Sequence, residues 1–136
     1  MVLGPLLPDH VLRLMSPADR KLLGKAGRTA AETLARAEAK SENELQEQIA
    51  SMLKRREIVF IRPAMFRKST LPPGWPDFTF AYRGIAIGWE CKSVAGEPSD
   101  EQLRMHAHME ANGWRIDIIR SLHGAVEILN GIDLGE

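Results

Sequence analysis

The sequence has few of the features that would place it in a specialised class of protein. It holds a single cysteine, Cys91, which excludes an internal disulfide and a cysteine-rich zinc site. No apolar run is long enough to span a bilayer, so a membrane protein is not expected. The first ten residues lack the basic lead and the small-residue cleavage site of a secretory signal. We therefore expect a cytoplasmic location.

Net charge is also lacking. Lysine and arginine number 18, as do aspartate and glutamate, so no global positive field attracts nucleic acid. The charge is uneven, however, because a basic cluster with one acid falls between positions 54 and 68. Its members are Lys54, Arg55, Arg56, Arg62, Arg67 and Lys68. They are the candidates for contact with DNA phosphates, although a solvated helix end explains the first three equally well.

The length and balance of the chain bound its organisation. With 136 residues, 44% of them hydrophobic and 26% charged, it suits one domain with a short appendage. Ser16 and Pro17 predict the start of a short helix. Thr29 predicts the start of a longer helix to Arg56, which either breaks at a second capping signal, Ser41, or runs on.

After Arg56 the sequence changes to short apolar runs. We expect strands at residues 58–61, 77–82, 85–94 and 114–120, and a helix from 99 to 112. A last element is expected at 125–129, whose type, helix or strand, the sequence leaves undecided. The second and third strands form a hairpin with a tight Arg83-Gly84 turn. This order predicts an α/β fold, a mixed sheet flanked by helices. Residues 1–40 would be an N-terminal helical extension of a domain at 41–136.

Three charged residues stand where the predicted sheet is otherwise apolar. Asp77 follows Pro76 at a strand entrance, where a turn-capping acid is the competing interpretation. Glu90 and Lys92 lie two apart in the next strand, so both project from one face. Burying such a pair is costly unless the charges pair or bind an ion, although a cross-strand salt bridge gives the same pattern.

These residue types suit a hard divalent cation. Mg²⁺ and Mn²⁺ take oxygen ligands, and one or two carboxylates plus a substrate phosphate suffice for Mg²⁺. Asp77 and Glu90 would supply oxygens, with the backbone carbonyl of Cys91 as a third ligand. The ion would activate a water, and Lys92 would orient that water and stabilise the developing oxyanion. The Cys91 side chain is expected to pack on the opposite face.

The first long helix adds a candidate acid. Its apolar stripe consists of Leu45, Ile49 and Met52. Glu42 shares this face, since steps of three, seven and ten residues return near the same angle, whereas Glu44 does not. Glu42 is therefore a candidate fourth acid and possible metal ligand, with a glutamate that merely suits the helix dipole as the alternative.

The helix after Ser99 adds polar residues of another kind. Gln102 stands at the position that completes a capping box with Ser99. His106 lies one turn further along the same helix. A lone helix histidine is usually packed or solvated, so no role is predicted for it.

These residues form a combination that is specific as a whole. It comprises Gly74-Trp75-Pro76-Asp77, Glu90-Cys91-Lys92, Gln102 in a capped helix, Ser41-Glu42 with Leu45-Gln46, Gly96 and Gly113. Over residues 41–130 it resembles the VRR-Nuc branch of the PD-(D/E)xK nucleases. The resemblance implies a restriction-endonuclease-like fold, Mg²⁺ or Mn²⁺, and hydrolysis of phosphodiester bonds in DNA.

The resemblance also implies roles by position. Asp77 and Glu90 become metal ligands, and Lys92 becomes the catalytic lysine. Glu42 becomes the helix acid and Gln102 a supporting glutamine. Small stand-alone members are typically of phage or bacterial origin, act as homodimers, and are associated with branched DNA such as flaps and four-way junctions. Residues 1–40 match nothing in the pattern.

Other functions fit the same expected fold. One is an inactive DNA-junction-binding or assembly module, against which the intact set of Asp77, Glu90 and Lys92 argues. Another is a site-specific restriction-type nuclease, which would need base-reading elements outside the catalytic core. A third is a structural protein with chance motifs. The sequence favours a metal-dependent endonuclease acting on structured DNA.

Overall fold

The structure, a computed structural model, describes residues 29–63 and 70–135. The chain divides into two units, Met1–Lys40 and Ser41–Glu136, which are taken separately. The helix expected at Ser16 lies outside the described residues, as do Arg67 and Lys68. The sheet and the hydrophobic core belong to the second unit.

The first described helix, α3, spans Ala30–Arg55 without interruption. Thr29 and Glu32 form the expected capping box, with the Glu32 amide 3.1 Å from the Thr29 hydroxyl. The alternative break at Ser41 does not occur, because strong helix formers continue through it without glycine or proline. The predicted stripe is confirmed in the second unit, where Leu45, Ile49 and Met52 are buried.

Four strands form one mixed sheet in the order β1-β2-β3-β4. Their bounds are β1 Phe60–Ile61, β2 Phe78–Tyr82, β3 Ile85–Cys91 and β4 Arg115–Ile119. The first three are antiparallel neighbours, and β4 runs parallel to β3. The expected β2–β3 hairpin is confirmed, and its turn residues Arg83 and Gly84 both have positive φ, at 49° and 81°, as a two-residue hairpin turn requires.

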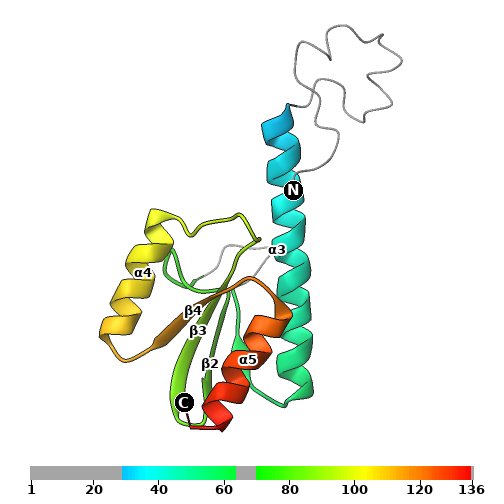
Figure 1. Cartoon of the computed structure of the whole chain (residues 1–136). Helices are drawn as coiled ribbons and strands as arrows, with labels where there is room; N and C mark the ends of the chain where they lie inside the picture. Colours follow the sequence, from blue (N-terminus) through cyan, green and yellow to red (C-terminus); the bar gives the residue numbers. More distant parts are fainter. Residues whose placement is uncertain (1–28, 64–69, 136) are drawn as a thin grey trace, which may run out of the picture. The chain divides into compact units, whose positions relative to one another are not determined.

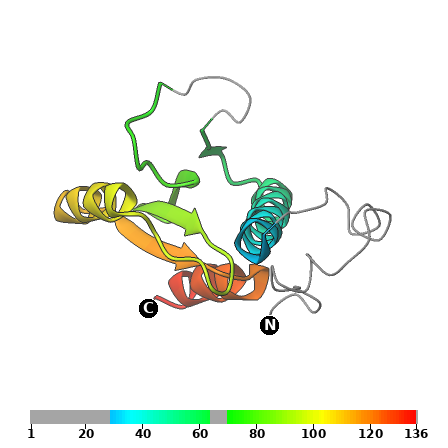
Figure 2. The same cartoon turned by 90° about the horizontal axis from the view of Figure 1, so that it is seen from above.

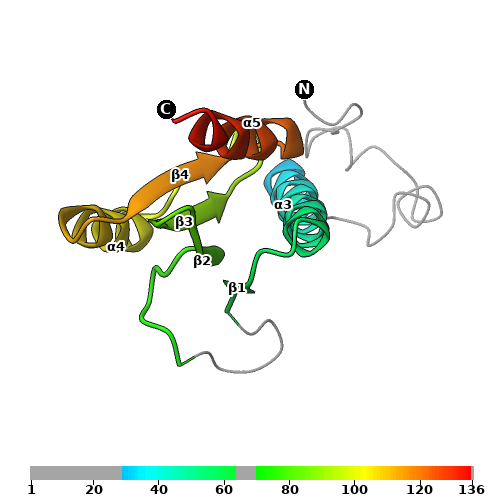
Figure 3. The same ribbon diagram turned by 90° about the horizontal axis from the view of Figure 1, so that it is seen from below.

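Helices cover both faces of the sheet. Helix α4, Asp100–Ala111, connects β3 to β4, and α5, Leu122–Asp133, follows β4. Figures 1 and 2 show α4 on one side of the strands, with α5 and the later turns of α3 on the other. The view from below in Figure 3 repeats this arrangement. The α/β architecture with a mixed sheet flanked by helices is therefore confirmed.

The main core lies on the side of α3 and α5. Phe78, Phe80, Ile87 and Trp89 from the sheet meet apolar residues of both helices there. The Phe80 and Trp89 rings pack edge to face with centroids 4.9 Å apart. Among the described residues, no helix combines the length and the apolar character needed to cross a membrane.

Three elements differ from expectation by more than one residue at an end. The first strand is shorter than predicted, and β3 ends at Cys91, not at Val94. The element of undecided type at 125–129 is part of a longer helix, α5, which begins at Leu122. Its start signal is Ser121, whose hydroxyl accepts from the Gly124 amide at 3.0 Å.

Candidate active site

Asp77 enters the sheet through a tightly fitted loop. Gly74 has a φ of 83°, and a Cβ there would lie 2.6 Å from the Glu101 carbonyl oxygen of α4, so only glycine fits without a shift. Pro76 is buried against Gly88, where an added Cβ would come within 3.1 Å of the proline ring. The Asp77 carboxylate then accepts from the Cys91 amide at 2.8 Å. These contacts fix Asp77 beside the end of β3.

Glu90 and Lys92 come from the end of β3 and project from the face opposite to the main core. Glu90 is 2% exposed, although its neighbours Trp89 and Cys91 are the residues that pack in the core. The Lys92 ammonium lies 4.0 Å from a Glu90 oxygen. The predicted shared face of Glu90 and Lys92 is thus confirmed, as is the packing of the Cys91 side chain.

Glu42 of α3 approaches the same group of residues. Asp77, Glu90, Lys92 and Glu42 together form the charged centre. The Glu42 carboxylate lies 3.8 Å from the Lys92 ammonium and is partly buried. Lys92 therefore lies within ion-pair distance of two carboxylates, those of Glu42 and Glu90. This contact supports Glu42 as a partner of Lys92, while its role as a metal ligand stays a prediction, as does that of the Cys91 carbonyl.

Helix α4 supplies hydrogen bonds to both Glu90 oxygens. Gln102 donates to one oxygen at 3.1 Å, and the His106 Nε2 atom lies 3.3 Å from the other. Gln102 also completes the expected capping box, since its side-chain oxygen accepts from the Ser99 amide at 2.9 Å. The helix start and the Glu90 carboxylate are thus joined through one side chain.

The protonation of the centre follows from its burial. Desolvation raises the pKa of Glu90 to about 9, and the charge of Asp77 and a hydrogen bond to it add to the rise, against the lowering effect of Lys92. Desolvation lowers the pKa of His106, so its neutral form is favoured. Burial also raises the pKa of the Cys91 thiol, which makes it a poor nucleophile.

The donor set fits a hard divalent cation. Two carboxylates, Asp77 and Glu90, meet beside the end of β3, where a bound cation would favour the ionised form of the buried Glu90. Within the described residues, no group of three His, Cys, Asp or Glu side chains forms a ready-made cage. Mg²⁺ needs no such cage, because it keeps several waters and uses one or two carboxylates. Asp77 and Glu90 are therefore the residues that could hold it.

The basic cluster lies in several different surroundings. Lys54 and Arg55 are exposed at the end of α3, twelve or more residues and so about 18 Å beyond Glu42 along the helix. Arg56 donates to Asn130 of α5. Arg62 is bonded to Gln46 and Glu47 of α3, at 2.9 and 3.4 Å, and lies over the Phe78 ring.

These surroundings separate the basic residues as candidates for DNA contact. Arg62 has structural partners, and Lys54 and Arg55 stand a long way from Asp77 and Glu90 along α3. Arg67 and Lys68 remain candidates for DNA contact from the sequence alone.

Two residues of this region were not predicted from the sequence. His106 gave no signal beyond its one-turn spacing from Gln102. Arg120, directly after β4, donates to the carbonyl oxygens of Ser93 and Gly96 at 2.7 and 2.6 Å, and less closely to that of Val94. It thereby fastens the loop that follows Lys92 to the end of β4. Only the parallel pairing of β3 and β4, which the sequence did not give, brings these segments together.

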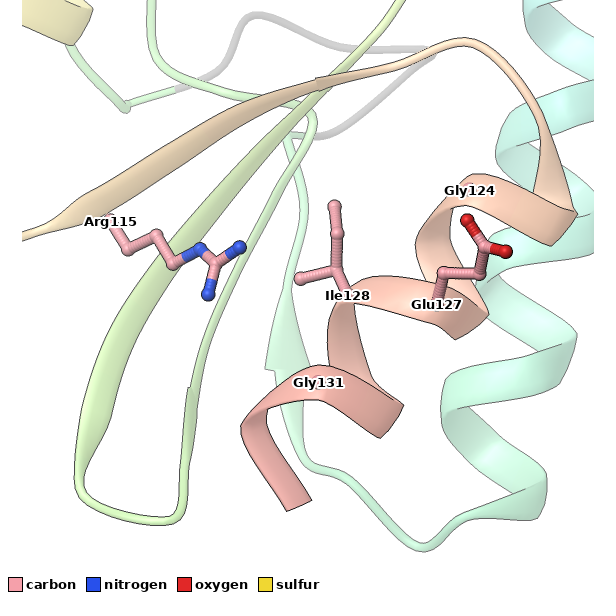
Figure 4. A pocket seen from close by; sticks show the side chains of 5 residues that line it. All are labelled: Arg115, Gly124, Glu127, Ile128 and Gly131. Carbon is pink, nitrogen blue, oxygen red and sulfur yellow. The ribbon is translucent and has the colours of Figure 1, made fainter. Parts of the chain in front are cut away.

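A hollow of about 290 Å³ lies elsewhere, between β4 and α5. Figure 4 shows Arg115 on one side of it and Glu127 and Ile128 of α5 on the other. Arg115 is already paired with Asp117 at 3.0 Å, and neither Asp77 nor any other residue of the charged centre lines this hollow. The chemistry therefore points to the charged centre, not to the hollow.

Comparison with known proteins concerns the fold. No protein-family model and no curated protein matches the chain. A solved structure described as a VRR_NUC domain matches with a TM-score of 0.53 and 18% identity, over 66% of this chain and 95% of that one. The chain therefore has the fold of a VRR_NUC domain, and the expectation of a restriction-endonuclease-like sheet is confirmed.

Proposed function

We propose that this protein is a divalent-metal-dependent endonuclease that hydrolyses phosphodiester bonds in structured DNA. The observation that carries the proposal is the meeting of Asp77, Glu90 and Lys92 on one face of the sheet, at the end of β3. The fold likeness to a VRR_NUC domain supports it, because that name denotes a nuclease domain and the sequence motifs resemble the same family.

The residues divide the chemistry among them. Asp77 and Glu90 would hold Mg²⁺ or Mn²⁺ through carboxylate oxygens. Such an ion, when bound, lowers the pKa of a water and neutralises charge on the phosphate. Lys92 would orient the attacking water and stabilise the charge that develops on phosphate oxygens. Glu42, 3.8 Å from the Lys92 ammonium, would keep it in place.

The substrate and the assembly follow from the resemblance and from symmetry. A four-way junction has two-fold symmetry, and two paired cuts need two copies of a chain with one site, so we propose a homodimer. Light scattering at micromolar concentration is expected to give twice the chain mass of 15.2 kDa. A monomer that nevertheless makes paired cuts would contradict the dimer.

The deciding experiment compares matched DNAs. Labelled duplex, flap and four-way junction of shared sequence are incubated with the protein and Mg²⁺, Mn²⁺ or EDTA. We expect cleavage of the branched DNAs only with an ion. Asp77→Asn should remove cleavage while its amide oxygen still accepts from the Cys91 amide. Arg104→Met, an exposed position on α4 outside the basic cluster, serves as the control for nonspecific damage.

Each result decides something different. Cleavage that survives EDTA or Asp77→Asn would contradict the site. Tight, ion-independent junction binding with no cleavage in either ion would favour the inactive binding module instead. Cleavage of plain duplex at one fixed sequence would favour the restriction-type alternative.

A further inference from the structure

Helix α4 holds the Glu90 carboxylate at both oxygens, which is more than a cap or a packed helix requires. Gln102 reaches one oxygen at 3.1 Å and His106 the other at 3.3 Å. The two residues are four apart and so lie on the same side of the helix. We infer that His106 is a positioning residue, which together with Gln102 fixes Glu90 for metal binding; this inference rests on the proposed function.

The orientation of Gln102 is set by the helix start. Its side-chain oxygen accepts from the Ser99 amide at 2.9 Å, while the Ser99 hydroxyl accepts from the Gln102 amide at 3.1 Å. With its oxygen engaged there, the NH₂ group of Gln102 is the part that faces Glu90. Gln102 and His106 together form a clamp on the two Glu90 oxygens, and the cap of α4 thus fixes the Gln102 half of this clamp.

His106 forms the other half from inside the protein. It is 5% exposed, although its helix neighbour His108 faces solvent. A polar ring buried in this way needs a hydrogen-bond partner, and Glu90 is at the right distance. Toward an ionised carboxylate, Nε2 makes this bond only as a donor, in the tautomer that carries its proton there.

The clamp leaves Glu90 able to bind an ion. Each carboxylate oxygen has about two lone-pair positions. One bond from Gln102 and one from His106 therefore leave a second position on each oxygen, on the side where Asp77 and Lys92 also approach Glu90. Partners that orient a metal ligand in this manner typically change metal affinity by 10- to 100-fold when removed. His106 is thus expected to act on the affinity for the ion through Glu90, without touching the ion.

The test measures Mn²⁺ and Mg²⁺ binding by calorimetry on the full-length, EDTA-stripped protein. His106→Leu keeps the volume and removes the donor, so Mn²⁺ affinity should fall by about 10- to 100-fold. His106→Gln restores an NH₂ at similar reach and should bind within a few-fold of the parent. His106→Asn is polar but too short, and should resemble His106→Leu. His108→Leu, on the exposed side of α4, is the matched control and should bind normally.

Thermal unfolding in EDTA separates positioning from folding. If His106→Leu does not fold, the comparison of His106→Gln with His106→Asn still decides the question. A folded His106→Leu with parental affinity would overturn the inference alone, as would equal losses in the Gln and Leu variants. Absence of Mn²⁺ and Mg²⁺ binding by the parent protein would overturn the proposed metal site as well.

Discussion

The two faces of strand β3 are similarly buried but carry side chains of opposite polarity. Trp89 and Cys91 point into the core that α3 and α5 cover, and both are fully buried. Glu90 lies between them in sequence, points the other way, and is 2% exposed. Burial alone therefore does not distinguish core from site. What differs is the partners: aromatic and aliphatic groups on one face, and carboxylates, an amide, an imidazole and an ammonium on the other.

The difference shows which face gives stability and which gives chemistry. Apolar burial on the core face stabilises the fold by about 25 cal/mol for each Å² removed from water. On the other face, burial works against the charge of Glu90 and raises its pKa. The following substitutions should separate the two contributions, since each alters one face and leaves the other intact.

The largest effect is expected from Trp89→Ala. Removing this fully buried ring from contact with Phe80 should lower the free energy of unfolding by about 3–5 kcal/mol. Urea unfolding followed by circular dichroism measures it. If the variant loses less than about 1 kcal/mol, the core face does not have the energetic role assigned to it here.

Lys92→Met should have the opposite effect, a large loss of cleavage with little loss of stability. The methionine keeps the apolar stem and removes the ammonium, so cleavage should fall by about 10²–10³-fold or more, the range for loss of one group that stabilises developing charge. The fold should persist, because the pKa of Glu90 is already about 9 and loss of the Lys92 charge favours the protonated form further. Initial cleavage rates and urea unfolding are measured together, with Arg104→Met as control. Near-parental cleavage would remove Lys92 from the mechanism.

A pH profile should sharpen the contrast further. Glu90 has a pKa of about 9 in the folded protein and near 4.5 when unfolded, so the folded state binds the extra proton between these values. Stability of the EDTA-treated protein should therefore fall as pH rises from about 5 toward 9. Glu90→Gln should flatten this fall, whereas Cys91→Ala on the core face should leave the slope unchanged. A parent protein that gains stability over the same interval would contradict the raised pKa.

The smallest effect is expected at the helix cap. Ser99→Ala removes the hydroxyl that accepts from the Gln102 amide, which should cost about 1 kcal/mol of stability. Thermal unfolding measures this loss. Ser121→Ala removes a similar cap from α5, away from the charged centre, and is the matched control. Only the Ser99 variant should also weaken Mn²⁺ binding, and equal Mn²⁺ affinity in both variants would break the link between cap and Glu90.

The sequence predicted those parts of the molecule that depend on local spacing. The Arg83-Gly84 hairpin, the capped helix after Ser99 and the shared face of Glu90 and Lys92 each follow from a period or a turn signal within a few residues. The start of α5 was not predicted, although its cap, Ser121, is a local signal as well.

The rest depends on contacts that are distant in the chain. That His106 reaches Glu90 requires the crossover from β3 through α4 to β4, which no local pattern specifies. The 2% exposure of Glu90 likewise results from packing by segments on either side of it. The roles of Arg67 and Lys68, outside the described residues, stay predictions.

The fastening of the loop by Arg120 has a consequence for proton chemistry. An arginine side chain stays protonated at every pH at which a protein folds, so its bonds to the carbonyls of Ser93 and Gly96 do not titrate. Glu90 and His106, by contrast, have pKa values that burial has moved. The charged centre can therefore gain or lose protons while the loop after Lys92 keeps its anchor. The carbonyl bonds come from one terminal nitrogen of Arg120, while the other lies 3.5 Å from Glu97, and a single lysine ammonium at position 120 could not divide its contacts in this way.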